Sequence, residues 1–149
     1  MAERKIIHAT FIVINGKGVL LKGKSGSGKS DLALRLIENK NAELVADDAV
    51  EIYEKNGKII GQVPQNLVGL LEVRGIGIVA YPYQEKAVID MVVELKDDVD
   101  AIERMPLMQK EVIFGLEINK IDLYAKENSA PDKIIAALRL FDVHSAIER

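Results

Sequence analysis

The sequence predicts a strand-rich α/β domain with a mixed sheet, one helix after a glycine-rich loop and one helix near the C-terminal end. Short apolar runs rich in β-branched residues recur along most of the chain. Two Asn-Gly pairs, at positions 15–16 and 56–57, separate such runs in the way that tight hairpin turns do. Apolar residues recur convincingly at helical spacing in only two segments. We expect residues 1–149 to form a single domain.

The first half of the chain sets out these elements in order. Two β-like runs, Ile6–Ile14 and Val19–Leu21, flank the first turn. After the glycine-rich loop, the apolar spacing predicts a helix over residues 30–40. The next apolar run, residues 44–52, predicts a strand with two adjacent aspartates in its middle, and a returning strand follows around 58–63.

The second half adds further strands and the closing helix. Residues 67–80, LVGLLEVRGIGIVA, predict a strand, a glycine-punctuated turn and a second strand. The near-continuous apolar run at 86–95 is typical of a central strand that is covered on both faces. Two more strands are predicted near 111–114 and 118–125, and the last helix begins near residue 130.

Composition excludes several classes of protein. The chain has no cysteine, which excludes disulfides, thiolate zinc sites and cysteine nucleophiles. The net charge is −3 with both signs scattered, so we expect no nucleic-acid partner. No apolar run approaches the roughly 18 residues needed to cross a bilayer, and the first residues lack the features of a signal peptide. We therefore expect a cytoplasmic protein that does not bind membranes.

The glycine-rich loop carries the strongest functional signal. It reads GKSGSGKS and satisfies G-x-x-x-x-G-K-[ST] at every fixed position, between a predicted strand and a predicted helix. Backbone N–H groups in such a loop, together with the helix N-terminus, bind phosphates. Lys29 would reach the β- and γ-phosphates and Ser30 would ligate Mg²⁺. The sequence thus predicts a P-loop domain whose nucleotide-binding residues are Gly23, Lys24, Ser25, Gly26, Ser27, Gly28, Lys29 and Ser30.

Asp47 and Asp48 form a costly charged pair in an apolar strand unless something pairs with them. A helix over residues 30–40 is roughly 16 Å long, and the six residues of strand that return to Asp47 span roughly 20 Å. The two aspartates should therefore lie level with the phosphate loop. If the strand stays extended, the two side chains point to opposite faces, and only one looks directly into the site. That carboxylate could hold Mg²⁺ or accept the proton of an attacking hydroxyl.

Other polar residues fit the same site less specifically. Glu72 and Arg74 share one face of a strand, where they could serve as an acid for Mg²⁺ and a cation for phosphate, or form a solvated ion pair. His8 is a lone strand histidine, which is usually structural. Asp90 and Asp122 each end a short apolar run, so either could supply the metal ligand of a generic P-loop enzyme.

The order of these motifs resembles the catalytic domain of HPr kinase/phosphorylase, particularly the short, single-domain forms found in some bacteria. His8, the phosphate loop, LVADDAVEI and LLEVRGIGI carry the resemblance, which is strong over residues 6–79 and weak after about residue 95. The resemblance implies a phosphate-loop fold related to phosphoenolpyruvate carboxykinases. It also implies an enzyme that phosphorylates a serine of HPr, the small phosphocarrier of the sugar phosphotransferase system, using ATP or pyrophosphate. Many members reverse the reaction by phosphorolysis.

The resemblance implies a role for each matching residue. Asp47 matches the catalytic aspartate that accepts the serine proton, and Asp48 matches its neighbour, which would support it or the metal. His8 matches a histidine that hydrogen-bonds the catalytic aspartate. Glu72 matches a metal-linked acid, and residues 74–78, RGIGI, match the family signature. Mg²⁺ would then be held by Ser30 and an acid from Asp48 or Glu72, with Lys29 neutralising the γ-phosphate.

The later part of the chain departs from the long family members. Residues 79–81 read VAY where those members tend to carry Asn or Asp, and the chain lacks their Pro-Gly-Arg-Asn stretch, which holds an arginine tied to phosphorolysis. Kinase activity on HPr or an HPr-like phosphocarrier is therefore the main expectation, with phosphorylase activity second. A P-loop kinase for a small hydroxyl substrate and a nucleotide-binding regulator without transfer are the alternatives. Long members form hexamers through this domain, so a homo-oligomer is a further expectation.

Overall fold

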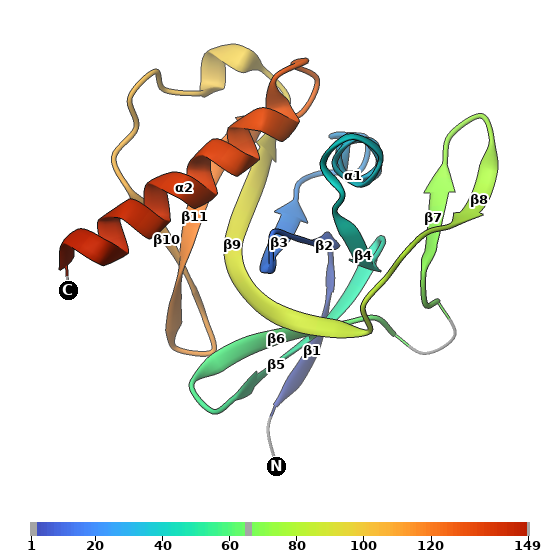
Figure 1. The fold of residues 1–149 in the computed structure, drawn as a ribbon, viewed down its shortest axis with the longest axis horizontal. Helices are drawn as coiled ribbons and strands as arrows, with labels where there is room; N and C mark the ends of the chain where they lie inside the picture. The colour runs from blue at the N-terminus through green and yellow to red at the C-terminus, as the bar shows by residue number, and fades with distance from the viewer. Residues whose placement is uncertain (1–2, 65–66, 149) are drawn as a thin grey trace.

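The structure is a computed structural model that describes the backbone of residues 3–64 and 67–148, with side chains as far as residue 142 (Figure 1). A strongly curved mixed sheet of nine strands carries two helices, and a two-stranded sheet lies beside it. The elements are β1 (Arg4–His8), β2 (Thr10–Ile14), β3 (Lys17–Lys22), α1 (Lys29–Lys40), β4 (Glu43–Ala46), β5 (Ala49–Lys55), β6 (Lys58–Gln62), β7 (Leu70–Val73), β8 (Gly77–Ala80), β9 (Lys86–Lys96), the 3₁₀ turn η1 (Val99–Ala101), β10 (Gln109–Ile113), β11 (Leu116–Tyr124) and α2 (Ala130–Glu148).

The long strand β9 joins the two halves of the curved sheet. Its first residues pair antiparallel with β6, and its remaining residues run parallel to β3 on one side and β11 on the other. The strand order is β1-β5-β6-β9-β3-β2-β4, with β11 and β10 branching from β9. The prediction of a mixed sheet with a central strand at 86–95 is confirmed.

Both Asn-Gly turns form hairpins, as the sequence predicts. Asn15 and Gly16 have φ values of 51° and 76°, and Asn56 and Gly57 have 54° and 78°. Both central residues of a type I′ turn need this left-handed region, which Asn and Gly reach at low cost. The turns fix the register of β2 with β3 and of β5 with β6, because Ile14 pairs with Lys17 and residue 55 with residue 58.

Two segments predicted as single strands are each divided in two. The run 6–14 breaks at Ala9, between β1 and β2, and the run 44–52 breaks at Asp47 and Asp48, between β4 and β5. The pairings His8 with Ala49 and Phe11 with Ala46 keep one register across both breaks. The two chain segments therefore bend together as they pass from one half of the sheet to the other, and the aspartates lie at the bend.

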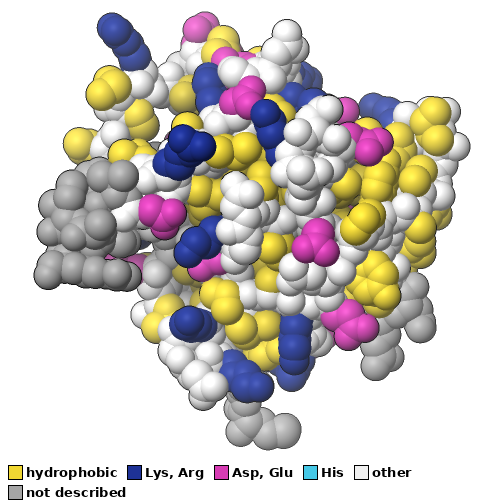
Figure 2. All heavy atoms as spheres, viewed as in Figure 1, with side chains coloured by type: hydrophobic (Ala, Val, Ile, Leu, Met, Phe, Trp, Pro, Cys, Tyr) yellow, Lys and Arg dark blue, Asp and Glu magenta, His cyan; other side chains and the backbone are white. Residues whose placement is uncertain are grey.

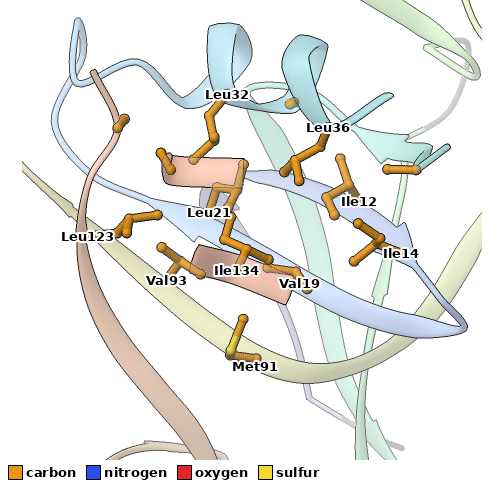
Figure 3. Packing of buried hydrophobic residues seen from close by; sticks show 14 of the residues in the cluster. Ile12, Ile14, Val19, Leu21, Leu32, Leu36, Met91, Val93, Leu123 and Ile134 are labelled. Carbon is orange, nitrogen blue, oxygen red and sulfur yellow. The ribbon is translucent and has the colours of Figure 1, made fainter. Parts of the chain in front are cut away.

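Two hydrophobic clusters hold the fold together. One lies between the sheet and the helices, where Leu32 and Leu36 of α1 contact the sheet close to Ile134 of α2 (Figure 3). The other lies on the opposite face of the same strands, around Phe11. A Cβ added to Gly61 would lie 2.7 Å from the Phe11 ring, so glycine is needed there for close packing. Each large side chain buried in this way contributes roughly 1.5–3 kcal/mol.

The helices and the hairpin β7–β8 complete the fold. Lys40 at the end of α1 pairs with Asp132 at 2.6 Å and so ties α1 to the first turn of α2. The hairpin buries Leu71 against the helix-side cluster, but Ile76 and Ile78 on its outer part are 78% and 73% exposed. Hydrophobic side chains are visible on that side of the molecule in Figure 2. Within the described residues, no helix combines the length and apolarity that crossing a bilayer requires.

Candidate active site

The phosphate loop lies between β3 and α1 and is shaped by its glycines. Gly26 and Gly28 have φ values of 83° and 99°, and the Ser27 N–H donates to the Lys24 carbonyl at 3.0 Å. Gly28 caps α1 without a side-chain hydrogen bond, and a Cβ at Gly26 would meet no atom within 4 Å. The first N–H groups of α1 are thus left for an anion, as phosphate binding at a helix N-terminus requires.

The Lys29 side chain lies inside the phosphate loop and is hydrogen-bonded to the loop backbone. Its side chain is buried, and Nζ donates to the carbonyls of Gly23 at 2.7 Å and Lys24 at 3.0 Å. Burial lowers the pKa of Lys29 from its ordinary value of 10.5, while the nearby carboxylates of Asp48, Asp47 and Glu94 act in the opposite direction. The loop therefore holds a desolvated cation beside the place where phosphate charge would be bound.

Asp47 is hydrogen-bonded to Ser30, the residue whose hydroxyl ligates the cation in P-loop proteins. The Ser30 Oγ donates to Asp47 Oδ1 at 2.6 Å, and the Thr10 Oγ1 donates to the same oxygen at 3.1 Å. The arithmetic that placed the aspartates level with the loop is confirmed by the Ser30 contact. Because the Ser30 proton points to Asp47, the lone pairs of its oxygen are free for a cation.

Asp48 points elsewhere because the chain bends at this residue. Its φ of 70° lies in the left-handed region, which Asp tolerates better than most residues, and its carbonyl accepts from Ala9 N–H at 3.2 Å. The Asp48 side chain is 77% exposed and its Oδ1 lies 3.1 Å from His8 Nδ1. The carboxylate beside His8 is thus Asp48, whereas the resemblance placed His8 beside Asp47. The expected separation of the two carboxylates arises from a bend in the chain, and the strand does not stay extended there.

A single open pocket of about 430 Å³ brings most of the predicted residues together. The phosphate loop and the first turn of α1 form one side, and His8 and Asp48 form another. Glu72 and Arg74, at the end of β7, face the same space. Asp47 reaches this pocket only through Ser30. The lining residues are His8, Ser25, Gly26, Gly28, Lys29, Ser30, Asp31, Leu34, Asp48, Glu72, Val73 and Arg74.

The residues in this pocket suit a cation that is bound together with phosphate. Among the described residues, His, Asp and Glu side chains do not gather in groups of three that could hold a metal by themselves. Mg²⁺ usually keeps several waters and takes only one or two carboxylates in addition to substrate phosphates. The Ser30 hydroxyl and the carboxylates of Asp48 and Glu72, all on one pocket, fit that requirement.

Strand register separates the two other aspartates from the loop. Asp90 accepts from the Gly18 N–H at 2.8 Å, near the start of β3, whereas the loop follows the end of that strand. Asp122 on β11 accepts from the Gln109 side chain at 3.3 Å. Neither lines the phosphate-loop pocket. The β9 residue that pairs with Lys22, directly before the loop, is Glu94.

Sequence reasoning missed two residues near the site, Thr10 and Glu94. Glu94 also lines a second cavity of about 560 Å³, beside the phosphate loop, together with His8 and Lys22. Its signal was present, since it closes the apolar run 86–95 at the end where ligands bind in parallel sheets. Thr10 has no comparable signal, because only the strand register shows that it lies opposite Asp47.

Comparison with known proteins identifies the family of this chain. The family described as the HPr serine kinase C-terminal domain matches residues 1–141. This chain belongs to that family. The match extends well past residue 79, where the strong resemblance in the motifs ends. The predicted family and the predicted strand-rich P-loop fold are therefore confirmed.

Individual members of the HPr kinase family are similar in sequence and in structure. The HPr kinase/phosphorylase of Clostridium tetani is 44% identical over 93 residues, which cover 61% of this chain and 30% of that protein. The HPr kinase/phosphorylase of Lactobacillus johnsonii is 46% identical over 80 residues, or 53% of this chain and 25% of that protein. The matched segments thus span under a third of these relatives. The solved structure of the Hpr(Ser) kinase/phosphatase from Coxiella burnetii has a TM-score of 0.81 and 27% identity, covering 95% of this chain and 99% of that chain.

Proposed function

We propose that this domain is an ATP-dependent protein-serine kinase that uses Mg²⁺ and acts on HPr or an HPr-like phosphocarrier. The family and the names of its relatives support the activity and the partner. The observation that carries the proposal is the shared pocket, in which an anion-binding loop, carboxylates and an arginine face the same space. A cytoplasmic location, homo-oligomer formation and secondary phosphorylase activity remain predictions from the sequence.

The phosphate loop, Lys29 and Arg74 provide the binding side of the reaction. The N–H groups at the start of α1 bind phosphate oxygens, and the Lys29 ammonium leaves its carbonyl partners to neutralise the terminal phosphate. Ser30 would hold the cation together with the carboxylate of Glu72, which lines the same pocket. When bound, ATP supplies the phosphoryl group, and Mg²⁺ neutralises charge that develops on the phosphates.

We propose that Asp48 accepts the serine proton and that Asp47 orients the Ser30 hydroxyl. The resemblance implied the proton for Asp47, but two observations support the opposite division. Asp47 Oδ1 already accepts two hydroxyl protons, whereas the Asp48 carboxylate is exposed to the pocket beside His8. As the serine oxygen of the partner forms its bond to phosphorus and the bond to the leaving oxygen breaks, the serine proton passes to Asp48. His8 holds that carboxylate in place.

The test is transfer of radiolabelled phosphate from ATP to purified HPr in the presence of Mg²⁺. Wild-type protein should label a serine of HPr, and Asp48→Asn should lower the rate by about 10²–10⁴ while it still binds ATP, because only the base is removed. Asn suits the left-handed backbone of this position. Glu54→Gln, on the exposed end of β5, is the matched control and should transfer at the wild-type rate.

Two results would contradict the proposed function. Wild-type protein that binds ATP but labels no HPr would indicate a nucleotide-binding regulator. Label that appears on small hydroxyl compounds and not on HPr would indicate a small-molecule kinase with the same phosphate loop.

A further inference from the structure

Thr10 is a polar residue at the start of a strand that is otherwise apolar and completely buried. β2 reads TFIVI, and the Thr10 side chain has no exposed surface. A buried hydroxyl is costly unless it makes a hydrogen bond. The Thr10 hydroxyl donates to Asp47 Oδ1 at 3.1 Å, so its cost is offset by a bond to a charged acceptor.

The position of Thr10 follows from the strand register. His8 pairs with Ala49 and Phe11 with Ala46, which places Thr10 directly opposite Asp47 at the bend. Its neighbour Ala9 donates its N–H to the Asp48 carbonyl. Ala9 and Thr10 are therefore each hydrogen-bonded to one of the two aspartates. The Ala9 backbone N–H donates to Asp48, and the Thr10 hydroxyl donates to Asp47.

A chain of two hydroxyls and one carboxylate leads from Thr10 to the pocket. Thr10 and Ser30 donate to the same oxygen of Asp47, at 3.1 Å and 2.6 Å. Two donors on one oxygen oppose rotation of the carboxylate, and the fixed carboxylate in turn keeps the Ser30 proton away from the pocket. The Ser30 lone pairs then face the space where a cation would be bound.

We propose that Thr10 is a positioning residue for the cation site. Its hydroxyl fixes Asp47, and Asp47 orients Ser30 as a ligand for the divalent cation that accompanies the nucleotide. Thr10 itself touches neither the cation nor the nucleotide. Partners of metal ligands act in this way when they fix the ligand's orientation, and their loss weakens metal binding although every ligand remains. The inference rests on the proposed function only because it requires a cation–nucleotide complex at the phosphate loop.

The test compares ATP binding at increasing Mg²⁺ with ATP binding in EDTA, by calorimetry on the whole chain. Thr10→Val keeps the shape of the side chain and removes the hydroxyl. It should raise the Mg²⁺ concentration for half-maximal ATP binding about tenfold, and leave the affinity in EDTA unchanged. Thr10→Ser keeps the hydroxyl, and its Mg²⁺ dependence should be closer to that of wild type than the Mg²⁺ dependence of Thr10→Val. Ile12→Val, a buried change two residues along β2, is the matched control and should shift neither value. Thermal unfolding shows that each variant is folded.

Three results would overturn the proposal. The first is a Thr10→Val protein with the Mg²⁺ dependence of wild type. The second is a Thr10→Val protein whose ATP binding is weakened equally in EDTA and in Mg²⁺. The third is a wild-type protein that binds ATP equally with and without the cation. Because the readout is binding, the proposed function can fail separately. A wild-type protein that labels no HPr, together with the predicted Mg²⁺ shift in Thr10→Val, would contradict the kinase proposal and support the role of Thr10.

Discussion

Two parts of the pocket, which we call the floor and the wall, are attached to the rest of the protein in different ways. The floor consists of the phosphate loop and Ser30, with Asp47 and Thr10 behind them, and hydrogen bonds of 2.6–3.1 Å join these buried and half-buried groups. The wall is the β7–β8 hairpin, whose polar residues Glu72 and Arg74 are exposed. The floor belongs to the main sheet and its first helix, whereas the wall is a separate two-stranded sheet.

This difference indicates a division of tasks within one site. A floor in which Asp47 already fixes the Ser30 hydroxyl has a cation ligand oriented in advance, and such preorganisation favours the electrostatic stabilisation of phosphoryl transfer. The wall presents an acid and an arginine on an exposed hairpin, where a larger partner can reach them. Three predictions test whether the two parts are as different as they look.

The largest expected effect concerns the attachment of the wall. Leu71 is completely buried in the helix-side cluster, so Leu71→Ala should lower the free energy of unfolding by about 2–5 kcal/mol. Ile78 on the same hairpin is 73% exposed, so Ile78→Ala should change it by less than about 0.5 kcal/mol. Urea unfolding measures both. Equal effects of the two changes would show that the wall is not anchored by its inner face.

The next effect concerns the floor. Lys29→Ala should weaken ATP binding about 10- to 100-fold, because a charge-assisted contact to phosphate is removed. Lys55→Ala, at the exposed end of β5, removes the same charge far from the loop and serves as the control. Isothermal calorimetry with ATP and Mg²⁺ gives both affinities. A Lys29→Ala protein with unchanged ATP affinity would contradict the assignment of the phosphate loop.

The smallest effect is a dependence of the free energy of unfolding on pH, which should arise from Lys29 in the floor. The pKa of Lys29 is lowered in the folded protein by burial. Between that lowered pKa and the ordinary value of 10.5, the unfolded chain binds more protons at this residue than the folded chain. The free energy of unfolding of wild type, relative to Lys29→Met, should therefore rise with pH through this alkaline window. Denaturant unfolding of both proteins at several pH values measures the difference, and a flat or falling difference would contradict the buried state of the lysine.

The elements that the sequence predicts well are those with a local cause. The phosphate loop needs its glycines at fixed spacing, and the two Asn-Gly turns need residues that tolerate a left-handed backbone. The run at 86–95 is apolar on both faces because β9 is covered on both sides. Each of these signals lies within a few residues of the structure that it produces.

The division between Asp47 and Asp48 has no such local signal. It depends on the common bend of two strand segments 37 residues apart, which brings Thr10 opposite Asp47. Alternation along an extended strand predicted that the two carboxylates would separate, and they do, but through the left-handed backbone of Asp48. The sequence pattern also makes Asp90 a possible metal ligand, since only the register of β3 with β9 shows that it lies away from the loop.

In the proposed site, Asp47 orients the cation ligand Ser30 and Asp48 accepts the serine proton. The most direct measurement compares Asp47→Asn with Asp48→Asn for both the Mg²⁺ dependence of ATP binding and the rate of transfer to HPr at saturating Mg²⁺. We predict that Asp47→Asn raises the Mg²⁺ requirement about tenfold or more and retains transfer, whereas Asp48→Asn keeps the wild-type Mg²⁺ requirement and loses transfer by about 10²–10⁴. The reverse pattern, with transfer lost in Asp47→Asn at saturating Mg²⁺ and kept in Asp48→Asn, would contradict this assignment of the two aspartates.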